Sequence, residues 1–307
     1  MTTTNSLAEK QNQPKAIELL AAFSQFYAWG KNALAIQIAL TVGLSGATAV
    51  VSLVYPNFKI YAVAIGASVT WLDVVFLDRI QICFRKRGAL VQEQLDQMLF
   101  EIPWNELRAG KPVELEEIYR AASNFLKANG DQKLRDWYPS TLSNIPLSTL
   151  RIICQRSCLW WDTSQRRVYG YWLTGLVTAA VIALWVVAIA LGLSFSAFVL
   201  SVYAPVAPAM IWAFREMRRQ KDASDSLEKS RNFLEGIWKR MGRREISSEE
   251  LLAVTRQIQD TLFENRSKNP LIFNWIYRWL RSDREATMRR TAEELASEIP
   301  PLHRDEQ

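Results

Sequence analysis

The stretch VYGYWLTGLVTAAVIALWVVAIALGLSFSAFVLSVYAPVAPAMIWAF, residues 168–214, decides the fold. It holds 47 consecutive residues without a single Asp, Glu, Lys or Arg. Because a bilayer core takes about 20 apolar helical residues to cross, this run is long enough for two crossings and too long for one. A glycine and two serines interrupt the aliphatic pattern at 192–196, where a short turn is expected. The stretch therefore predicts a membrane hairpin.

A second charge-poor region lies near the N-terminus. Residues 33–55 and 60–77 are each long and apolar enough for a span, and Asp73 is the one ionisable residue within them. Charged residues are dense elsewhere, and strand patterns are scarce. The sequence thus predicts an all-α membrane protein with four transmembrane helices in two hairpins. Its expected parts are a cytosolic or interfacial N-terminal helix (1–32), the first transmembrane hairpin (33–78), a cytosolic helical insert (79–167), the second transmembrane hairpin (168–214) and a cytosolic helical tail (215–307).

The basic residues predict the orientation. Of the 37 Lys and Arg residues, 36 flank the hairpins on one side, and only Lys59 lies on the other. The positive-inside rule then puts both termini and the insert in the cytosol. Residues 1–14 have neither a basic start nor an apolar core with a cleavage site, so no cleaved signal peptide is expected.

The sequence offers little for catalysis. It contains no phosphate-binding glycine loop and no nucleophile elbow, and His303 is its single histidine. Cys83, Cys154 and Cys158 lie in the charge-rich segments, where thiols stay reduced and a packing role is expected. We therefore expect no enzyme activity, no cofactor and no metal.

Small residues recur at intervals of four in the spans. Such faces let helices approach closely, either within one four-helix unit or between subunits, and the sequence leaves both open. The candidate packing positions are Gly43, Ala47, Gly66, Gly175 and Ala179.

Two further features of the spans suggest a conduit. Asp73, with Thr70 one turn before it, either lines a cation path or is a boundary carboxylate that snorkels or pairs with N–H groups. Pro205 and Pro208 free backbone carbonyls in the fourth span, which serves either gating or the geometry of a helix end.

Basic and aromatic residues alternate ahead of the third span. This pattern suits contact with an anionic ligand, through phosphate binding and base stacking, and it equally suits the anionic headgroups of the membrane. The candidate contacts are Arg151, Arg156, Trp161, Arg166 and Arg167.

Several short motifs together resemble a known family, the S-4TM pore-forming effectors of bacterial defence systems. The most distinctive lies in the tail, where Asn265, Arg266, Pro270, Trp275 and Tyr277 stand out. Ser157-Cys158 differs from the family pattern, in which an asparagine is expected nearby. This tail motif begins at Gln259-Asp260. The other matching stretches are Leu95-Asp96, Pro103-Trp104, Trp137-Tyr138-Pro139, Cys154-Gln155-Arg156, Trp161-Asp162 and Arg166 to Tyr169.

The resemblance implies an inducible effector of the bacterial inner membrane. Such a protein stays silent until a nucleotide second messenger or an upstream sensor protein activates it. Its subunits then assemble into a homo-oligomer, in contact with the anionic lipids of the inner leaflet, and permeabilise the membrane; no nucleic acid polymer is expected as a partner. A constitutive ion channel or transporter, and a non-conducting scaffold or receptor, are the alternatives that the residues leave open.

Overall fold

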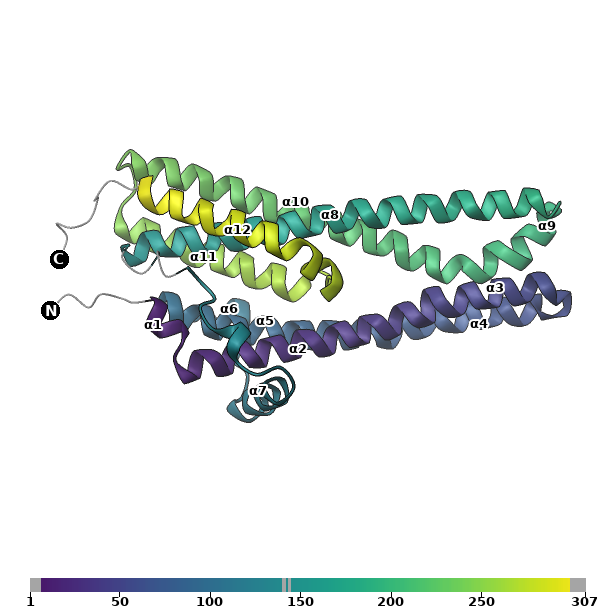
Figure 1. Cartoon of the computed structure of the whole chain (residues 1–307), viewed down its shortest axis with the longest axis horizontal. Coiled ribbons are helices and arrows are strands. Elements are labelled where there is room, and N and C mark those ends of the chain that lie inside the picture. The colour runs from purple at the N-terminus through teal and green to yellow at the C-terminus, as the bar shows by residue number, and fades with distance from the viewer. Residues whose placement is uncertain (1–6, 140–141, 143–144, 299–307) are drawn as a thin grey trace.

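Four long helices organise the molecule, and each is long and apolar enough to cross a membrane. They run Pro14–Val54, Pro56–Phe100, Leu147–Ala190 and Phe195–Gly242. In the computed structural model, which describes residues 7–139, 142 and 145–298, the described residues contain helices and no strand. The helices extend along the long axis of the molecule and are joined in pairs at its apolar end (Figure 1). The predicted fold class, an all-α membrane protein with two hairpins, is confirmed.

Each hairpin contains short π-helical segments within its spans. The first hairpin consists of α2 (Pro14–Ile38), η1 (Ala39–Leu44), α3 (Ser45–Val54), η2 (Pro56–Phe58), α4 (Lys59–Leu72), η3 (Asp73–Leu77) and α5 (Asp78–Phe100). The second consists of α8 (Leu147–Ala190), α9 (Phe195–Phe198), η6 (Val199–Tyr203) and α10 (Ala204–Gly242). Of these, η1, η3 and η6 are π-helical, whereas η2 is a single 3-10 turn. Because π-helical turns loosen the regular backbone ladder, they mark places where a span bends.

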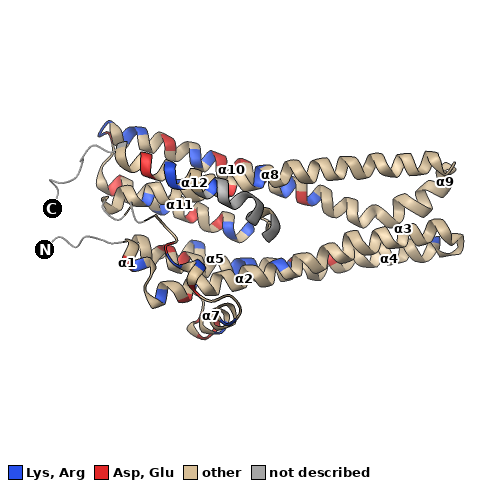
Figure 2. Ribbon diagram, viewed as in Figure 1, with Lys and Arg blue, Asp and Glu red and all other residues tan. Residues whose placement is uncertain are grey.

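The charged halves of these helices form a helical body, completed by shorter elements. These are α1 (Leu7–Gln11), α6 (Glu106–Ala109), α7 (Leu115–Asn129), η4 (Gln132–Leu134), α11 (Ser248–Lys268) and α12 (Asn274–Glu298). Charged residues gather on the body, whereas the two hairpin arms contain almost none (Figure 2). The boundaries expected near residues 32, 78, 167 and 214 thus lie within continuous helices that pass from the arms into the body.

Helix α2 is built into the core of the body. Its residue Leu20 is fully buried, as is Val91 of α5, and both belong to one apolar cluster that also takes in α7. The N-terminal helix expected within residues 1–32 corresponds to α2, which leads directly into the first span. Ser247 caps α11 as its sequence predicts, since its Oγ accepts a hydrogen bond from the backbone N–H of Glu250 at 3.2 Å.

The arms pack unequally. The fourth span lies against the first hairpin, where a Cβ added at Gly66 would stand 3.4 Å from Pro208 Cγ. In its most apolar stretch the fourth helix has 39% of its residues buried, whereas the third has only 11%. The third span therefore presents nearly its whole surface to its surroundings, which are lipid or another subunit.

Candidate functional site

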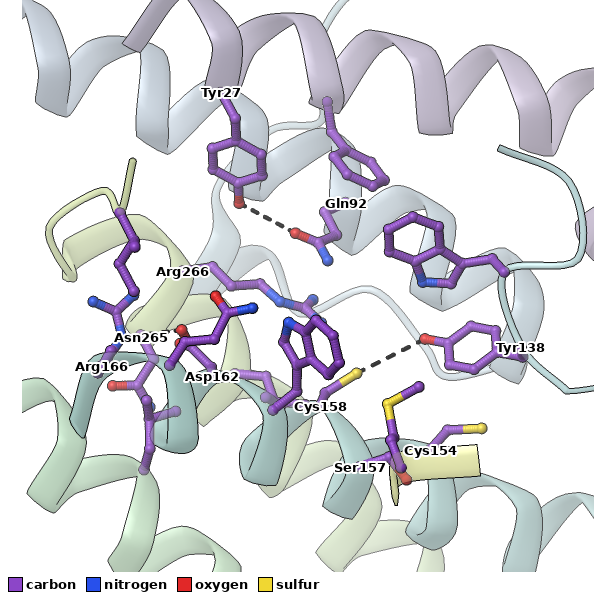
Figure 3. Close-up of a pocket in the computed structure, with 18 of the residues that line it drawn as sticks. Tyr27, Gln92, Tyr138, Cys154, Ser157, Cys158, Asp162, Arg166, Asn265 and Arg266 are labelled. Carbon is purple, nitrogen blue, oxygen red and sulfur yellow. Dashed lines mark hydrogen bonds and ion pairs between the residues drawn. The ribbon is translucent and has the colours of Figure 1, made fainter. Parts of the chain in front are cut away.

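A cavity of about 450 Å³ lies within the body. This volume is in the range of small-molecule sites. Its wall is formed by α2, α5, η4 with the segment after it, α8, α10, α11 and α12, and by residues 269–273, which join α11 to α12 and are called the strap here (Figure 3). Five aromatic side chains take part: Phe23, Tyr27, Trp137, Tyr138 and Trp161.

The lining carries an excess of positive charge. Six Lys or Arg residues contribute to it against two acidic ones, Asp136 and Asp162. Low-dielectric walls lined by one sign of charge strengthen the attraction for ligands of the other sign. The cavity is therefore electrostatically suited to an anion. The six basic residues are Lys31, Lys133, Arg135, Arg166, Arg266 and Arg289.

Arg166 ties three elements together at this wall. Its Nη1 donates to Gln220 Oε1 of α10 and to the carbonyl oxygen of Pro270 in the strap, each at 2.9 Å. Its Nε lies 3.0 Å from Asp162 Oδ1, one turn back on α8. With only 7% of its surface exposed, the guanidinium is held in place by these partners.

Arg266 belongs both to the cavity and to a polar network beside it. Its Nη1 donates to Asp96 Oδ2 of α5. Burial acts to lower the pKa of Arg266, but the Asp96 carboxylate outweighs it and raises the pKa above the ordinary value. The residue therefore stays a cation, locked between α11 and α5.

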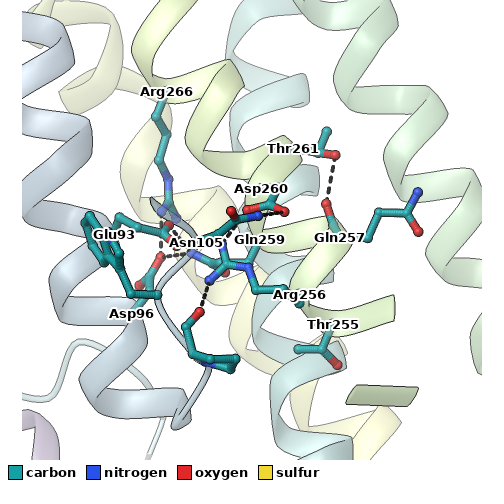
Figure 4. A network of polar contacts seen from close by, with 12 residues as sticks. Glu93, Asp96, Asn105, Thr255, Arg256, Gln257, Gln259, Asp260, Thr261 and Arg266 are labelled. Atoms are coloured by element: carbon teal, nitrogen blue, oxygen red, sulfur yellow. Dashed lines mark hydrogen bonds and ion pairs between the residues drawn. The ribbon is translucent and has the colours of Figure 1, made fainter. Parts of the chain in front are cut away.

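The network itself joins α5, α8 and α11 (Figure 4). Gln259 Nε2 donates to both Glu93 and Asp96, at 2.8 and 2.9 Å. Arg256 donates to Glu93 at 2.7 Å and to Asp260 at 2.8 Å, and Gln155 of α8 donates to Gln259 at 3.1 Å. Burial, and then the neighbouring Asp96, raise the pKa of Glu93. Segments far apart in the sequence are thereby held in one arrangement.

The structure brings some of the predicted ligand contacts together and separates others. Trp161 and Arg166 line the cavity. Arg151 instead donates to the carbonyl oxygens of Phe100 and Glu101, at 2.6 and 3.0 Å. Arg156 and Arg167 lie outside its lining and pair with Glu235 and Glu228 of α10, at 3.3 and 2.9 Å.

Part of the tail motif also lines the cavity. Asn265, Arg266 and Pro270 line it. Trp275 and Tyr277 fall within α12, but their side chains lie outside the described part of the structure. Ser157 and Cys158, which stand where the family pattern differs, are also in the lining, so the difference alters the wall of the cavity.

Gln165 and Gln92 are among the lining residues that sequence reasoning did not single out. Gln92 Oε1 accepts a hydrogen bond from Tyr27 Oη at 3.2 Å. Gln165 directly precedes two arginines, a context typical of a solvated helix face, so no pattern singled it out. Only the approach of the strap and α11, which are remote in the sequence, places Gln165 in a cavity wall.

The predicted conduit and packing residues have different surroundings. Asp73 is buried and accepts hydrogen bonds from Gln37 and Arg215, and Thr70 Oγ1 donates to the Gly66 carbonyl one turn back at 3.0 Å. Their role in lining a conduit stays a prediction, as does gating by Pro205 and Pro208, both of which are buried in the fourth span. Of the small-residue positions, Gly66 packs inside the molecule, whereas four are exposed: Gly43, Ala47, Gly175 and Ala179.

Comparison with known proteins identifies the family of the chain. A model of the SMODS-associating 4TM effector domain matches residues 5–295. The chain belongs to this family. In this 4TM effector, the motifs behind the resemblance meet in the body, where they build the cavity wall and the polar network.

A relative of this 4TM effector is a probable CBASS effector molecule of Bacillus cereus (strain VD146). The two sequences are 27% identical over 291 residues, which cover 91% of this chain and 94% of the relative. No solved structure matches the chain. The protein is thus a membrane effector of a family with a defence-related member.

Proposed function

We propose that this protein is an inducible effector that oligomerises and permeabilises the bacterial inner membrane in an antiphage response. It acts downstream of a nucleotide signal or a sensor partner. The name of the Bacillus cereus relative, a probable CBASS effector, supports the defence role. The observation that carries the proposal is the position of the positively lined cavity, whose walls include helices that continue into all four spans.

The strap is the element through which an occupied cavity would act on the spans. Leu271 and Ile272 of the strap are buried in a cluster with Leu34 of α2, Leu173 of α8 and Trp212 of α10. These three helices all continue into the membrane arms. A ligand that shifts the strap therefore changes the packing between the two hairpins at the point where they leave the body.

The third span is the surface through which subunits would assemble. Its exposed face carries Gly175 and Ala179, and a Cβ added at Gly175 would meet nothing within 4 Å. Helices associate in membranes through such small-residue faces, because they allow close backbone approach. The occupant of this face is a second copy of the chain, and the resulting ring of third and fourth spans encloses the conduit.

The orientation in the membrane follows the charges. The body carries nearly all basic residues, so both termini and the body lie in the cytosol, against the anionic inner leaflet. A cysteine introduced at Ser194, in the turn of the second hairpin, should react from the outside of intact cells with a membrane-impermeant maleimide. A cysteine introduced at Lys229 of α10 should react only after lysis, and the reverse pattern would contradict this orientation.

Dye release from liposomes tests the function directly. The full-length protein is reconstituted and challenged with a panel of linear and cyclic di- and trinucleotides. Release is expected only when an activating member of the panel is added, together with a shift from monomer to oligomer. Release without any nucleotide would instead identify a constitutive channel or transporter, and binding without release would identify a scaffold or receptor.

A further inference from the structure

Within the described residues, two amide side chains in the cavity wall have no hydrogen-bond partner for their nitrogen. They are Gln165 Nε2 on α8 and Asn265 Nδ2 on α11. Each residue has only 6% of its surface exposed, and both line the cavity. Buried donors are rarely left unpaired, because an unmade hydrogen bond costs stability. Two such donors on facing helices therefore indicate a site that is completed by a ligand with acceptor atoms.

The surroundings of these amides define the class of ligand. Tyr27 on α2 and Trp161 on α8 offer aromatic faces in the same wall, and planar bases stack on such faces. Lys133 and Arg135, at and after η4, are exposed where the wall meets solvent. Arg135 also pairs with Asp131 at 2.6 Å, and the exposed Asp136 lines the same edge. The cavity thus combines an aromatic, donor-bearing interior with a charged rim that offers Lys133 and Arg135 to an anion.

We propose that this cavity holds one nucleotide unit of the activating ligand, with its base inside and its phosphate at the rim. Gln165 and Asn265 donate to acceptor atoms on the edge of the base, and Lys133 and Arg135 attract the phosphate. This inference rests on the proposed function and adds to it the place and the means of recognition. A lipid headgroup shares the phosphate but lacks a planar base with acceptor atoms, so the two unpaired donors favour a nucleotide.

Gln165→Met is the sharpest variant, because it removes the unpaired donor while keeping the length of the side chain. Gln94→Met is its matched control: Gln94 of α5 also has an unpartnered polar atom, Oε1, but lies outside the cavity wall. Asn265→Leu is the companion variant on α11. It also removes the acceptor that Asn265 Oδ1 offers to Asn269 Nδ2 at 3.2 Å, so its melting temperature is measured alongside.

Binding is measured by calorimetry on the detergent-solubilised full-length protein. The probes are AMP, GMP, CMP and UMP, the cyclic dinucleotides of the same bases, ribose 5-phosphate, inorganic phosphate and phosphatidylglycerol vesicles. We expect at least one nucleotide to bind, and its Kd to rise by about tenfold or more in Gln165→Met and in Asn265→Leu, but not in Gln94→Met. Without ligand, Gln165→Met should melt at the wild-type temperature or above it.

Several outcomes would overturn the site. These are unchanged affinity in Gln165→Met and Asn265→Leu, binding of ribose 5-phosphate or inorganic phosphate as tight as that of any nucleotide, competition by phosphatidylglycerol, or no nucleotide binding at all. Dye release in the same preparations separates this inference from the proposed function. If both variants still release dye in response to nucleotide, the proposed site is wrong and the permeabilising function is retained. If the variants lose nucleotide binding but the wild type releases no dye, the permeabilising function is wrong and the proposed site is retained.

Discussion

Asp73 and Arg215 form an ion pair that joins the two membrane hairpins where they enter the body. Asp73 begins η3 in the first hairpin and is 3% exposed, whereas Arg215 lies on α10 of the second. Gln37 of α2 donates to the same carboxylate and accepts from Gln81 of α5 at 2.6 Å. The Asp73 carboxylate is thus paired with N–H donors, as one of its two interpretations expects, and its lining of a cation path stays a prediction.

Replacing Asp73 with Asn should destabilise the protein and loosen the contact between hairpins. Removing one partner of a buried pair leaves the other charge uncompensated, at a cost of about 3 to 5 kcal/mol. We expect a lower melting temperature in detergent for Asp73→Asn. The double variant Asp73→Asn/Arg215→Gln should recover most of the loss, because it leaves no lone charge. Strictly additive losses in the double variant would show that the two residues are not coupled.

The pair between Asp96 and Arg266 should matter far more than an exposed pair of the same chemistry. Asp96→Asn leaves the buried guanidinium of Arg266 without its counter-charge, so a loss of about 3 kcal/mol is expected. In α12, Arg290 and Glu294 lie 3.1 Å apart with side chains 83% and 61% exposed. Glu294→Gln should cost less than about 1 kcal/mol. Chemical denaturation of both variants measures the contrast, and equal losses would contradict the structural role of the network.

Assembly through the third span should be sensitive to bulk at Gly175. Gly175→Leu adds a side chain where the monomer has open space, so the monomer should melt as the wild type does, while nucleotide-induced oligomers and dye release are lost. Gly66→Leu supplies the opposite case, because its side chain would clash with Pro208 inside the monomer and lower the melting temperature. Sedimentation in detergent reports the oligomeric state. Normal oligomers from Gly175→Leu would exclude this face as the interface.

Glu216 should make stability fall as pH rises. The residue is 5% exposed on α10, and burial raises its pKa despite a 2.8 Å hydrogen bond from Gln220 and the nearby Arg219, Arg166 and Arg215. Above the ordinary pKa of about 4.3 and up to the raised folded value, the folded state binds more protons than the unfolded state. Its stability therefore declines with pH in that window, by at most about 1.4 kcal/mol per pH unit.

The variant Glu216→Gln tests this dependence, because the amide keeps an acceptor for Gln220 and does not titrate. It should melt higher than the wild type at pH 7.5, and the difference should close as the pH falls to 4.5. A difference that stays constant across this range would show that Glu216 does not titrate with a raised pKa.

The membrane arms could be predicted from the sequence and the cavity could not. Residues 168–214 carry no charge, and a bilayer admits only helices whose backbone groups are satisfied internally, so two spans followed from solvation alone. The same reasoning predicted the first hairpin despite Asp73, but not the partner of that carboxylate. Arg215 is remote in the sequence, and its approach depends on how the two hairpins pack.

The cavity depends on tertiary contacts that no local pattern encodes. Arg166 and Trp161 stood out by charge and aromaticity, and Asn265 and Arg266 by the family resemblance. Gln165 carried neither signal. Arg151, by contrast, matched the expected chemistry but serves to close the end of α5 through the carbonyl of Phe100. Residue type alone cannot separate an arginine that binds a ligand from one that satisfies backbone carbonyls.

The strap should couple the cavity to the membrane-spanning arms. A Cβ at Gly30 of α2 would lie 2.7 Å from Leu271 Cδ1, so Gly30→Ala displaces the side chain through which the strap contacts the first hairpin. Because Leu271 is buried between helices that lead into both arms, we expect dye release at lower nucleotide concentration, or without nucleotide. Gly170→Ala is the control, since a Cβ there meets nothing within 4 Å and alanine stabilises a helix by about 1 kcal/mol relative to glycine. If Gly30→Ala liposomes stay tight and respond to nucleotide as the wild type does, the strap does not transmit the signal, and the helices that line the cavity must do so without it.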